Sequence, residues 1–275
     1  IVAPPVEFTI TASHNGETVT VDKFSSYVQR EIPLPDGADP DKITTGVVVE
    51  PDGTVRHVPT KVILIDGKSS AQINSLTNST YTVVWHPVEF DDVSNHWAKD
   101  AVNEMGSRMV IEGTGNGKFS PDRDITRAEF AAIIVRALGL KPDSGAGVFA
   151  DVKETDELGS EIRTAYEYGL TNGYADGLFR PDDKITREQA MVILSRAMDI
   201  TGLKAKLPGY PEDAALRAYA DATQASGWAI GGIADCVRAG IVSGRNGSAL
   251  APLDFITRAE AAAMVERLLQ KSDLI

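Results

Sequence analysis

The chain is poor in cysteine and histidine, and it contains no long apolar run. Its single cysteine, Cys236, excludes a disulfide framework, and its place in the helical pattern WAIGGIADCVRAG favours a small buried residue over a nucleophile. The four histidines, at positions 14, 57, 86 and 96, form neither an HExxH motif nor a paired metal-binding spacing. No stretch approaches the roughly 20 apolar residues of a membrane-spanning helix. These absences argue against a membrane span, a metal site, and a redox or nucleotide cofactor.

Positive charge is also scarce. Lysines and arginines number 27 against 39 aspartates and glutamates, which gives a net charge of −12 at pH 7. Nucleic acid is therefore not an expected partner, because no basic surface is available to displace counterions from phosphates. An anionic ligand would have to be held by local cations, since the overall field repels it. The chain begins IVAPP without a methionine, so we interpret it as a piece of a longer protein.

The character of the sequence changes near residue 88. Before that point, β-branched segments such as VEFTITA, TGVVVEP and STYTVVWH alternate with NG, PDG and DG turn signals. This pattern predicts a β-sandwich-like module over residues 1–88, for which an immunoglobulin-like arrangement is one option. From Phe90 onward, helical patterns alternate with Gly- and Asp-rich loops. The expected fold class is therefore α+β and multidomain.

Three similar units make up the rest of the chain, with the same motifs in the same order. FDDV, FADV and YADA open the units, and ITRAE, ITREQ and ITRAE introduce the last helix of each. A unit of this size cannot bury its own apolar face, so the three are expected to pack together. We place the repeats at residues 89–145, 146–204 and 205–275. A glycine recurs before each central loop, where it fits a left-handed helix cap or a close backbone approach: Gly113, Gly173 and Gly244.

The ITR motif has a ready structural role in its threonine. A threonine followed three residues later by Glu or Gln is a capping box, which satisfies free amides at a helix N-terminus. The expected pairs are Thr126 with Glu129, Thr186 with Gln189, and Thr257 with Glu260.

Capping does not explain the arginine of the motif. Arg127, Arg187 and Arg258 each fall at the first helical position, where the helix dipole mildly disfavours a cation. Three in register indicate a bound anion, held by guanidinium and free amides, or an ion pair with a nearby aspartate. Both interpretations stay open, and they can coexist. The candidate partners are Asp92, Asp151 and Asp221.

These motifs together resemble the S-layer homology (SLH) domain. Repeat 1 shows FDDV, Trp97, GKFSPD and ITRAE, a near-complete match. Repeat 2 has Glu157 or Leu158 where the tryptophan should stand, and repeat 3 has Trp228 but Leu250 in place of the loop phenylalanine. The resemblance covers about residues 90–275.

The resemblance implies a pseudo-threefold helical assembly at the C-terminal end of a bacterial cell-surface protein, located in the cell wall or S-layer. Such triplets anchor exported proteins non-covalently to a secondary cell-wall polysaccharide linked to peptidoglycan. The ligand implied is pyruvylated N-acetylmannosamine, bound in grooves between repeats. Arg127, Arg187 and Arg258 would then hold the ketal carboxylate, since a guanidinium fork suits it. Trp97 and Trp228 would supply flat platforms for the sugar.

Further groups could bind the hydroxyl and acetamido groups of the sugar. The candidates are Asp92, Asp151, Asp221, the backbone amides at Gly113, Gly173 and Gly244, and Tyr174 and Arg245, which directly follow two of those glycines. Each has a structural alternative: the tryptophans as core, the aspartates as helix caps or arginine partners, and the glycines as C-caps only. Because repeat 2 lacks the tryptophan, we expect one or two working grooves. Replacing the arginines should weaken wall binding and leave the fold largely intact, because the capping boxes remain.

Two other functions are weighed against anchoring. A calcium-dependent, dockerin-like module would need oxygen ligands at loop positions 1, 3 and 5, but Lys118 takes the third position counted from Asn116. Part of a carbohydrate-active enzyme would need a carboxylate pair, whereas the repeated acids here come with capping and turn roles. No catalytic site is apparent, so the chain is not expected to be an enzyme, although its parent protein could be one. Lateral self-association into a surface lattice is a further option.

Overall fold

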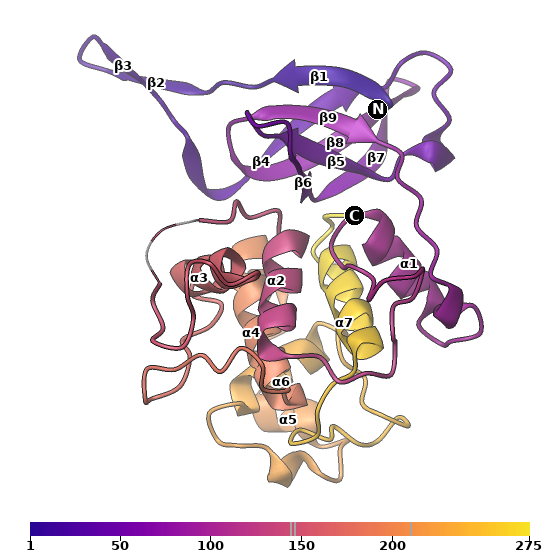
Figure 1. Ribbon diagram of the computed structural model, residues 1–275, viewed down its shortest axis with the longest axis vertical. Coiled ribbons are helices and arrows are strands. Elements are labelled where there is room, and N and C mark those ends of the chain that lie inside the picture. The colour runs from indigo at the N-terminus through magenta and orange to yellow at the C-terminus, as the bar shows by residue number, and fades with distance from the viewer. Residues whose placement is uncertain (144, 146, 210) are drawn as a thin grey trace.

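A computed structural model describes residues 1–143, 145, 147–209 and 211–275 of the chain, and in the view of Figure 1 its strands lie above its helices. The strands are β1 Ala3–Glu7, β2 Thr11–His14, β3 Glu17–Thr20, β4 Lys23–Pro33, β5 Thr45–Val49, β6 Val55–Val58, β7 Thr60–Ile65, β8 Lys68–Thr77 and β9 Thr80–Val84. The α-helices are α1 Lys99–Ser107, α2 Arg127–Ala137, α3 Gly159–Glu167, α4 Arg187–Thr201, α5 Glu212–Leu216, α6 Ile230–Arg238 and α7 Arg258–Lys271. Short 3₁₀ turns are η1 Pro40–Lys42, η2 Asp91–Val93, η3 Lys204–Lys206 and η4 Ala222–Gln224.

Two antiparallel sheets form the N-terminal module. One has the strand order β1-β9-β5-β6 and the other β4-β8-β7. Tyr81 and Val83 of the first sheet share a core with Ile32 and Ile73 of the second, so the predicted β-sandwich is confirmed. Its first strand pairs with its last, an order unlike the ABED and CFG sheets of an immunoglobulin domain. The hairpin of β2 and β3 stands apart, and its Asn-Gly turn has positive φ at both residues, as a type I′ turn requires.

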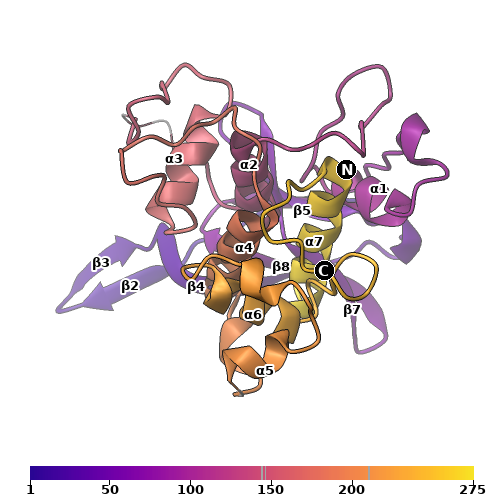
Figure 2. The ribbon, with the colours of Figure 1, turned by 90° about the horizontal axis from the view of Figure 1, so that it is seen from below.

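Each repeat consists of a short first helix, a loop and a capped second helix. The first helices are α1, α3 and α6, and the second are α2, α4 and α7. All three predicted capping boxes are confirmed: the threonine hydroxyl accepts from the amide three residues on, and the Glu or Gln there accepts from the threonine amide. Seen from below, α2, α4 and α7 occupy the centre, with α1 and α3 on opposite sides (Figure 2).

Equivalent backbone hydrogen bonds link the three repeats in a closed cycle. The amide of Ile185 donates to the carbonyl of Ile125 at 3.1 Å, that of Ile256 donates to Ile185 at 3.2 Å, and that of Ile125 donates to Ile256 at 3.0 Å. These isoleucines immediately precede the capping threonines, so the cycle aligns the three helix N-termini. The pseudo-threefold arrangement itself stays a prediction, which this cycle supports.

The N-terminal module packs directly on the repeats. The Tyr27 hydroxyl donates to the carbonyl of Leu138 at 2.7 Å, Arg108 donates to the carbonyl of Thr60 at 2.9 Å, and Lys61 pairs with Asp273 at 2.7 Å. Gly139, with φ of +63°, follows α2 at this junction. A Cβ there would lie 2.9 Å from Pro59 and 3.1 Å from the His57 carbonyl oxygen, so the close approach needs glycine.

The domain limits proposed from the sequence remain predictions, and the limit set between residues 145 and 146 falls partly outside the described residues. Within the part of the chain that the structure describes, no helix is long and apolar enough to cross a membrane.

Candidate functional site

The three ITR arginines are buried and join one repeat to the next. Their exposed fractions are 6% for Arg127, 3% for Arg187 and 6% for Arg258. Each donates from Nε to a loop carbonyl of the following repeat, at 2.7 to 2.9 Å: Arg127 to Phe179, Arg187 to Leu250 and Arg258 to Phe119. Burial lowers the pKa of all three guanidinium groups. These contacts give the arginines a structural role that the sequence did not predict.

The three aspartates brace loops. The carboxylate of Asp92 accepts from the amides of Phe119 and Ser120, at 2.8 and 2.7 Å. Asp151 and Asp221 accept in the same way from the equivalent loops. Burial raises the pKa of Asp92 and Asp221, but these amide hydrogen bonds outweigh it and leave both below the ordinary value. Among the described residues none of the three forms a direct ion pair with an ITR arginine, but each contributes a favourable charge to one of them: Asp151 to Arg127, Asp221 to Arg187 and Asp92 to Arg258. None caps a first helix, so that interpretation was wrong.

The three glycines sit where backbone and rings approach closely. A Cβ on Gly173, at φ +66°, would lie 2.4 Å from the ring of Phe149 and 2.8 Å from the Leu178 carbonyl oxygen. Gly113 and Gly244 meet the equivalent ring and carbonyl. The C-cap interpretation was wrong, because the left-handed residues that end the first helices are Met109, Gly169 and Gly240.

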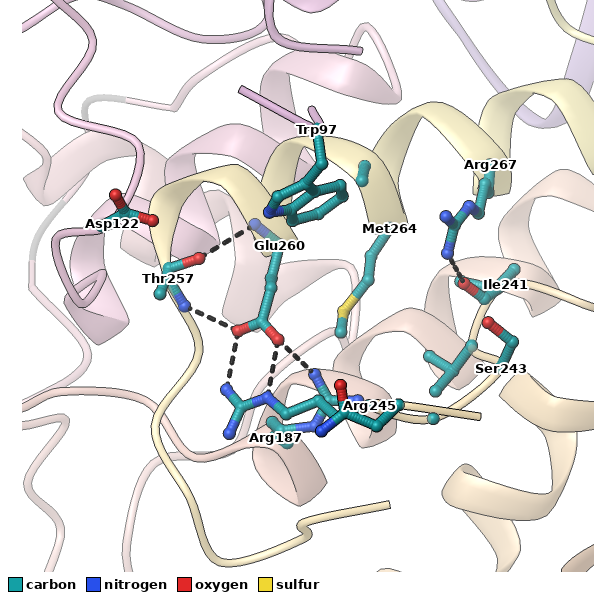
Figure 3. Close-up of a pocket in the computed structure, with 14 residues that line it drawn as sticks. Trp97, Asp122, Arg187, Ile241, Ser243, Arg245, Thr257, Glu260, Met264 and Arg267 are labelled. Atoms are coloured by element: carbon teal, nitrogen blue, oxygen red, sulfur yellow. Dashed lines mark hydrogen bonds and ion pairs between the residues drawn. The ribbon is translucent and has the colours of Figure 1, made fainter. Parts of the chain in front are cut away.

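One groove of about 550 Å³, which we call the Trp97 groove, takes residues from all three repeats. Repeat 1 contributes Trp97 and Asp122, and repeat 2 contributes Arg187. Repeat 3 supplies residues 241–246 and one face of α7, including Glu260, Met264 and Arg267 (Figure 3). Trp97 is 63% exposed, so the alternative that it belongs to the core is wrong.

Two arginines converge on one carboxylate in this groove. Glu260 accepts from Arg187 Nη1 at 3.0 Å and from Arg245 Nε and Nη2 at 2.8 Å each, while its Oε2 also caps Thr257 (Figure 3). Burial raises the pKa of Glu260, but the hydrogen bonds from Arg245 and the Thr257 amide outweigh it and hold the pKa below its usual range. The same pairing raises the pKa of Arg245. Glu260 therefore already engages the guanidinium groups of Arg187 and Arg245 inside the groove.

The third cation of the Trp97 groove, Arg267, makes fewer contacts than Arg187 and Arg245. Arg267 donates to the carbonyl of Ile241 at 3.2 Å, and among the described residues no carboxylate lies within ion-pair distance of it. Its guanidinium shares the groove with the apolar surfaces of Trp97 and Met264. The groove thus combines three arginines and two carboxylates with an exposed aromatic face.

A second groove, of about 290 Å³, takes most of its residues from repeats 1 and 2 and one, Arg258, from repeat 3; we call it the Glu157 groove. It contains Arg123, Arg136 and Arg258, each held by a carboxylate. Arg258 pairs with Glu129 at 3.1 Å, and Arg136 pairs with Glu112 at 3.3 Å. The start of α3 aligns Glu157, not Leu158, with Trp97, so a carboxylate takes the place of the aromatic platform.

The remaining repeat junction is different again. Trp228, 61% exposed, stands in repeat 3 where Trp97 stands in repeat 1. In repeat 2 the third residue of the capping box is Gln189, whose Nε2 donates to the Tyr174 hydroxyl at 3.2 Å. The Arg127 guanidinium lies 4.6 Å from the centre of the Tyr174 ring. Neither Trp228 nor Tyr174 lines the two grooves described above.

Sequence reasoning missed several groove residues, of which Arg267, Met264 and Asp122 are the main ones. A signal for Arg267 was present, because an arginine recurs at the same offset from each capping threonine, at Arg136, Arg196 and Arg267. Thr257, Glu260, Met264 and Arg267 also follow helical spacing on one face.

Comparison with known proteins agrees with this architecture. Residues 89–131, 148–191 and 218–262 match the family described as S-layer homology domain. The chain contains three S-layer homology domains. Two related proteins are named as enzymes: an amylopullulanase of Thermoanaerobacterium thermosulfurigenes, 35% identical over 76% of this chain, and the exoglucanase XynX of Acetivibrio thermocellus, 35% identical over 72%. A surface-layer 125 kDa protein of Lysinibacillus sphaericus is 31% identical over 67%.

The matches span only 11%, 18% and 15% of those three relatives. The SLH region of this chain is thus an anchoring module of the kind found in much longer surface proteins, and its location is the cell wall at the bacterial cell surface. Over the residues with a described placement, no group of three or more His, Cys, Asp or Glu side chains is arranged to hold a metal ion.

Proposed function

We propose that the SLH domains anchor their parent protein by binding a pyruvylated secondary cell-wall polysaccharide, and that the Trp97 groove is the principal site. The observation that carries the proposal is that Arg187, Arg245 and Arg267 line one groove with an exposed tryptophan. In Figure 3, Arg187 and Arg245 meet at Glu260, and Arg267 lies on the other side of Met264. A pyruvyl ketal adds one carboxylate to a sugar that otherwise offers hydroxyl and acetamido groups. Local arginines can attract that carboxylate even though the net charge of the chain, −12, repels anions.

The groove also suits the rest of the sugar. Trp97 offers a broad apolar face for the ring, and the loop 241–246 brings backbone groups alongside it. Arg267 lines the groove, donates one hydrogen bond to the Ile241 carbonyl and has no carboxylate partner among the described residues, so it is the first donor that we assign to the ketal. Arg245 can then exchange one of its bonds to Glu260 for the ligand, because its fork makes two.

The test is calorimetric titration of the chain with pyruvylated N-acetylmannosamine and, in parallel, with N-acetylmannosamine. We expect binding of the pyruvylated sugar only, close to one site per chain, and loss of that binding in Arg267→Ala. Arg196→Ala, which changes the equivalent residue of repeat 2 outside the Trp97 groove, is the matched control and should bind normally. Equal binding of both sugars, or of neither, would reject the carboxylate clamp.

A further inference from the structure

A larger cavity lies where the N-terminal module meets the repeats. This module cleft, of about 720 Å³, is walled on one side by the β5–β6 connection (Glu50, Pro51, Asp52 and Thr54) and by residues 55–57 of β6. The opposite wall comes from Met109, Glu112, Arg136, residues 140–142 and Glu161. In Figure 1, β6 lies over the upper end of α2, which is the junction that the cleft occupies. Its volume is within the range of small-molecule and cofactor sites.

The module cleft adjoins the Glu157 groove. Glu112 and Arg136 line both cavities, and their ion pair, at 3.3 Å, stands at the boundary. Arg136 also pairs with Glu161 of repeat 2, at 3.1 Å, inside the cleft. A chain-like ligand lying in the Glu157 groove would therefore meet the cleft at this ion pair. A ligand that extends from the groove into the cleft would therefore contact the N-terminal module as well as the repeats.

The cleft has one more carboxylate than it has cations. Its carboxylates are Glu50, Asp52, Glu112 and Glu161, and its cations are Arg56, Arg136 and Lys141. Burial lowers the pKa of His57 to about 3, so this histidine is neutral at pH 7. In the Glu157 groove the charges are balanced, with three arginines against Glu112, Glu129 and Glu157. Neither cavity has the excess of cations that would select an anion.

Both cavities offer carboxylate acceptors and arginine donors that are held in place, and the cleft adds the apolar side chains of Val55 and Met109. Carboxylates accept from hydroxyl groups and arginines donate to them, which matches an uncharged, hydroxyl-rich ligand. The walls are also held in place. Arg56 donates to the carbonyl of Gly139, and Lys141 pairs with Glu50 at 3.1 Å across the junction. A ligand would enter a site that is already formed.

We infer that the Glu157 groove and the module cleft form one extended site for an uncharged oligosaccharide, separate from the acid-selective Trp97 groove. The inference rests on the proposed function only in taking the ligand to be a stretch of wall glycan. It assigns residues 1–88 a part in carbohydrate binding, with the β5–β6 connection as the contact.

The test uses the whole chain and an uncharged probe, a depyruvylated wall-glycan fragment of four to six sugars. Val55 is 52% exposed in the wall of the cleft, so Val55→Trp should fill the cleft without disturbing the core. The matched control is Val19→Trp, at a 61% exposed strand position of the β2–β3 hairpin. We expect Val55→Trp to weaken binding of the fragment at least tenfold and Val19→Trp to change it less than twofold.

Binding of the pyruvylated monosaccharide is measured on the same variants. It should be unchanged in Val55→Trp, which also shows that the variant is folded. No binding of the uncharged fragment to the wild type, or equal binding to Val55→Trp, would overturn the inference. Failure of the pyruvylated sugar alone would reject the clamp in the Trp97 groove and leave the extended site standing, so the two proposals fail separately.

Discussion

The Trp97 groove and the Glu157 groove are built on the same plan and differ in their acids. Arg136 is held by Glu112 in the Glu157 groove and by Glu161 in the adjoining module cleft. The equivalent arginine of the Trp97 groove is Arg267, and by the alignment of the repeats Ser243 and Ala101 stand where those two glutamates would be. The anion selectivity that we propose for the Trp97 groove would therefore arise from the absence of carboxylates around a repeated arginine, and not from additional arginines.

The largest expected effects, and the clearest difference between the two grooves, come from replacing the ITR arginines. Arg187→Ala and Arg258→Ala each remove a buried cation that bonds a carbonyl and a glutamate of neighbouring repeats. Each should lower the free energy of unfolding by about 2–4 kcal/mol, measured by urea denaturation. Only Arg187→Ala should also abolish binding of the pyruvylated sugar at concentrations where the variant is folded. Loss of binding in both, with intact stability, would show that the two grooves act alike.

Exchanging the residues at the tryptophan position is the next largest change. Trp97→Ala should weaken binding of the pyruvylated sugar about tenfold, because the stacking surface is lost. It should alter the unfolding free energy by less than about 0.5 kcal/mol, since the side chain is exposed. Glu157→Trp gives the other groove a platform and removes an acid, so calorimetry should detect a second, weaker site. An unchanged affinity in Trp97→Ala would mean that the sugar binds elsewhere.

A carboxylate can also be put back beside Arg267. Ser243→Glu recreates the Glu112–Arg136 pairing in the Trp97 groove, where it should tie up Arg267 and repel the ketal. We expect a loss of affinity of about fivefold to tenfold, with little change in stability, because an exposed ion pair contributes only about 0–1 kcal/mol. Ser243→Gln, which has the same size without the charge, is the control. Equal losses in the two variants would indicate crowding and not charge.

The smallest expected effect concerns pH. Burial raises the pKa values of Glu129 and Glu260, but their hydrogen bonds from arginines and backbone amides outweigh this effect and hold both pKa values below the ordinary 4.5. A lowered pKa means that their contribution is complete above pH 4.5 and is lost as the pH falls through the folded value. The free energy of unfolding should be measured by denaturation at pH values from 6 to 3. Glu129→Gln and Glu260→Gln should each reduce its fall over that range by about 1 kcal/mol or less. Gln189 already shows the uncharged version in repeat 2, so Gln189→Ala should leave that dependence unchanged.

The sequence predicted much of the architecture because its signals are local. The capping boxes need only residues three apart, and the Asn-Gly turn of the β2–β3 hairpin needs two neighbours. The burial of Arg127, Arg187 and Arg258 could not be found in this way, since the carbonyl that each one bonds belongs to another repeat. Their buried contacts also replace the expectation that these arginines can be removed with the fold intact.

The aspartates teach the same lesson. Asp92 is 27 and 28 residues from the two amides that it binds, and nothing in its neighbourhood marks it as a brace rather than a ligand. The module cleft is invisible in the sequence for a further reason. It exists only because a β-strand connection and the end of α2 meet across the module boundary, and Gly139 is the one local trace of that approach.

The closed cycle of hydrogen bonds at Ile125, Ile185 and Ile256 also restricts how this region can evolve. A linear array of repeats can gain or lose a copy at its end, because each copy contacts only its neighbours in order. Here the last repeat bonds back to the first, so deleting one copy would leave two broken junctions and an arginine without its carbonyl. New binding preferences must therefore arise by substitution within a fixed set of three, as the exchange of tryptophan for glutamate between its grooves illustrates.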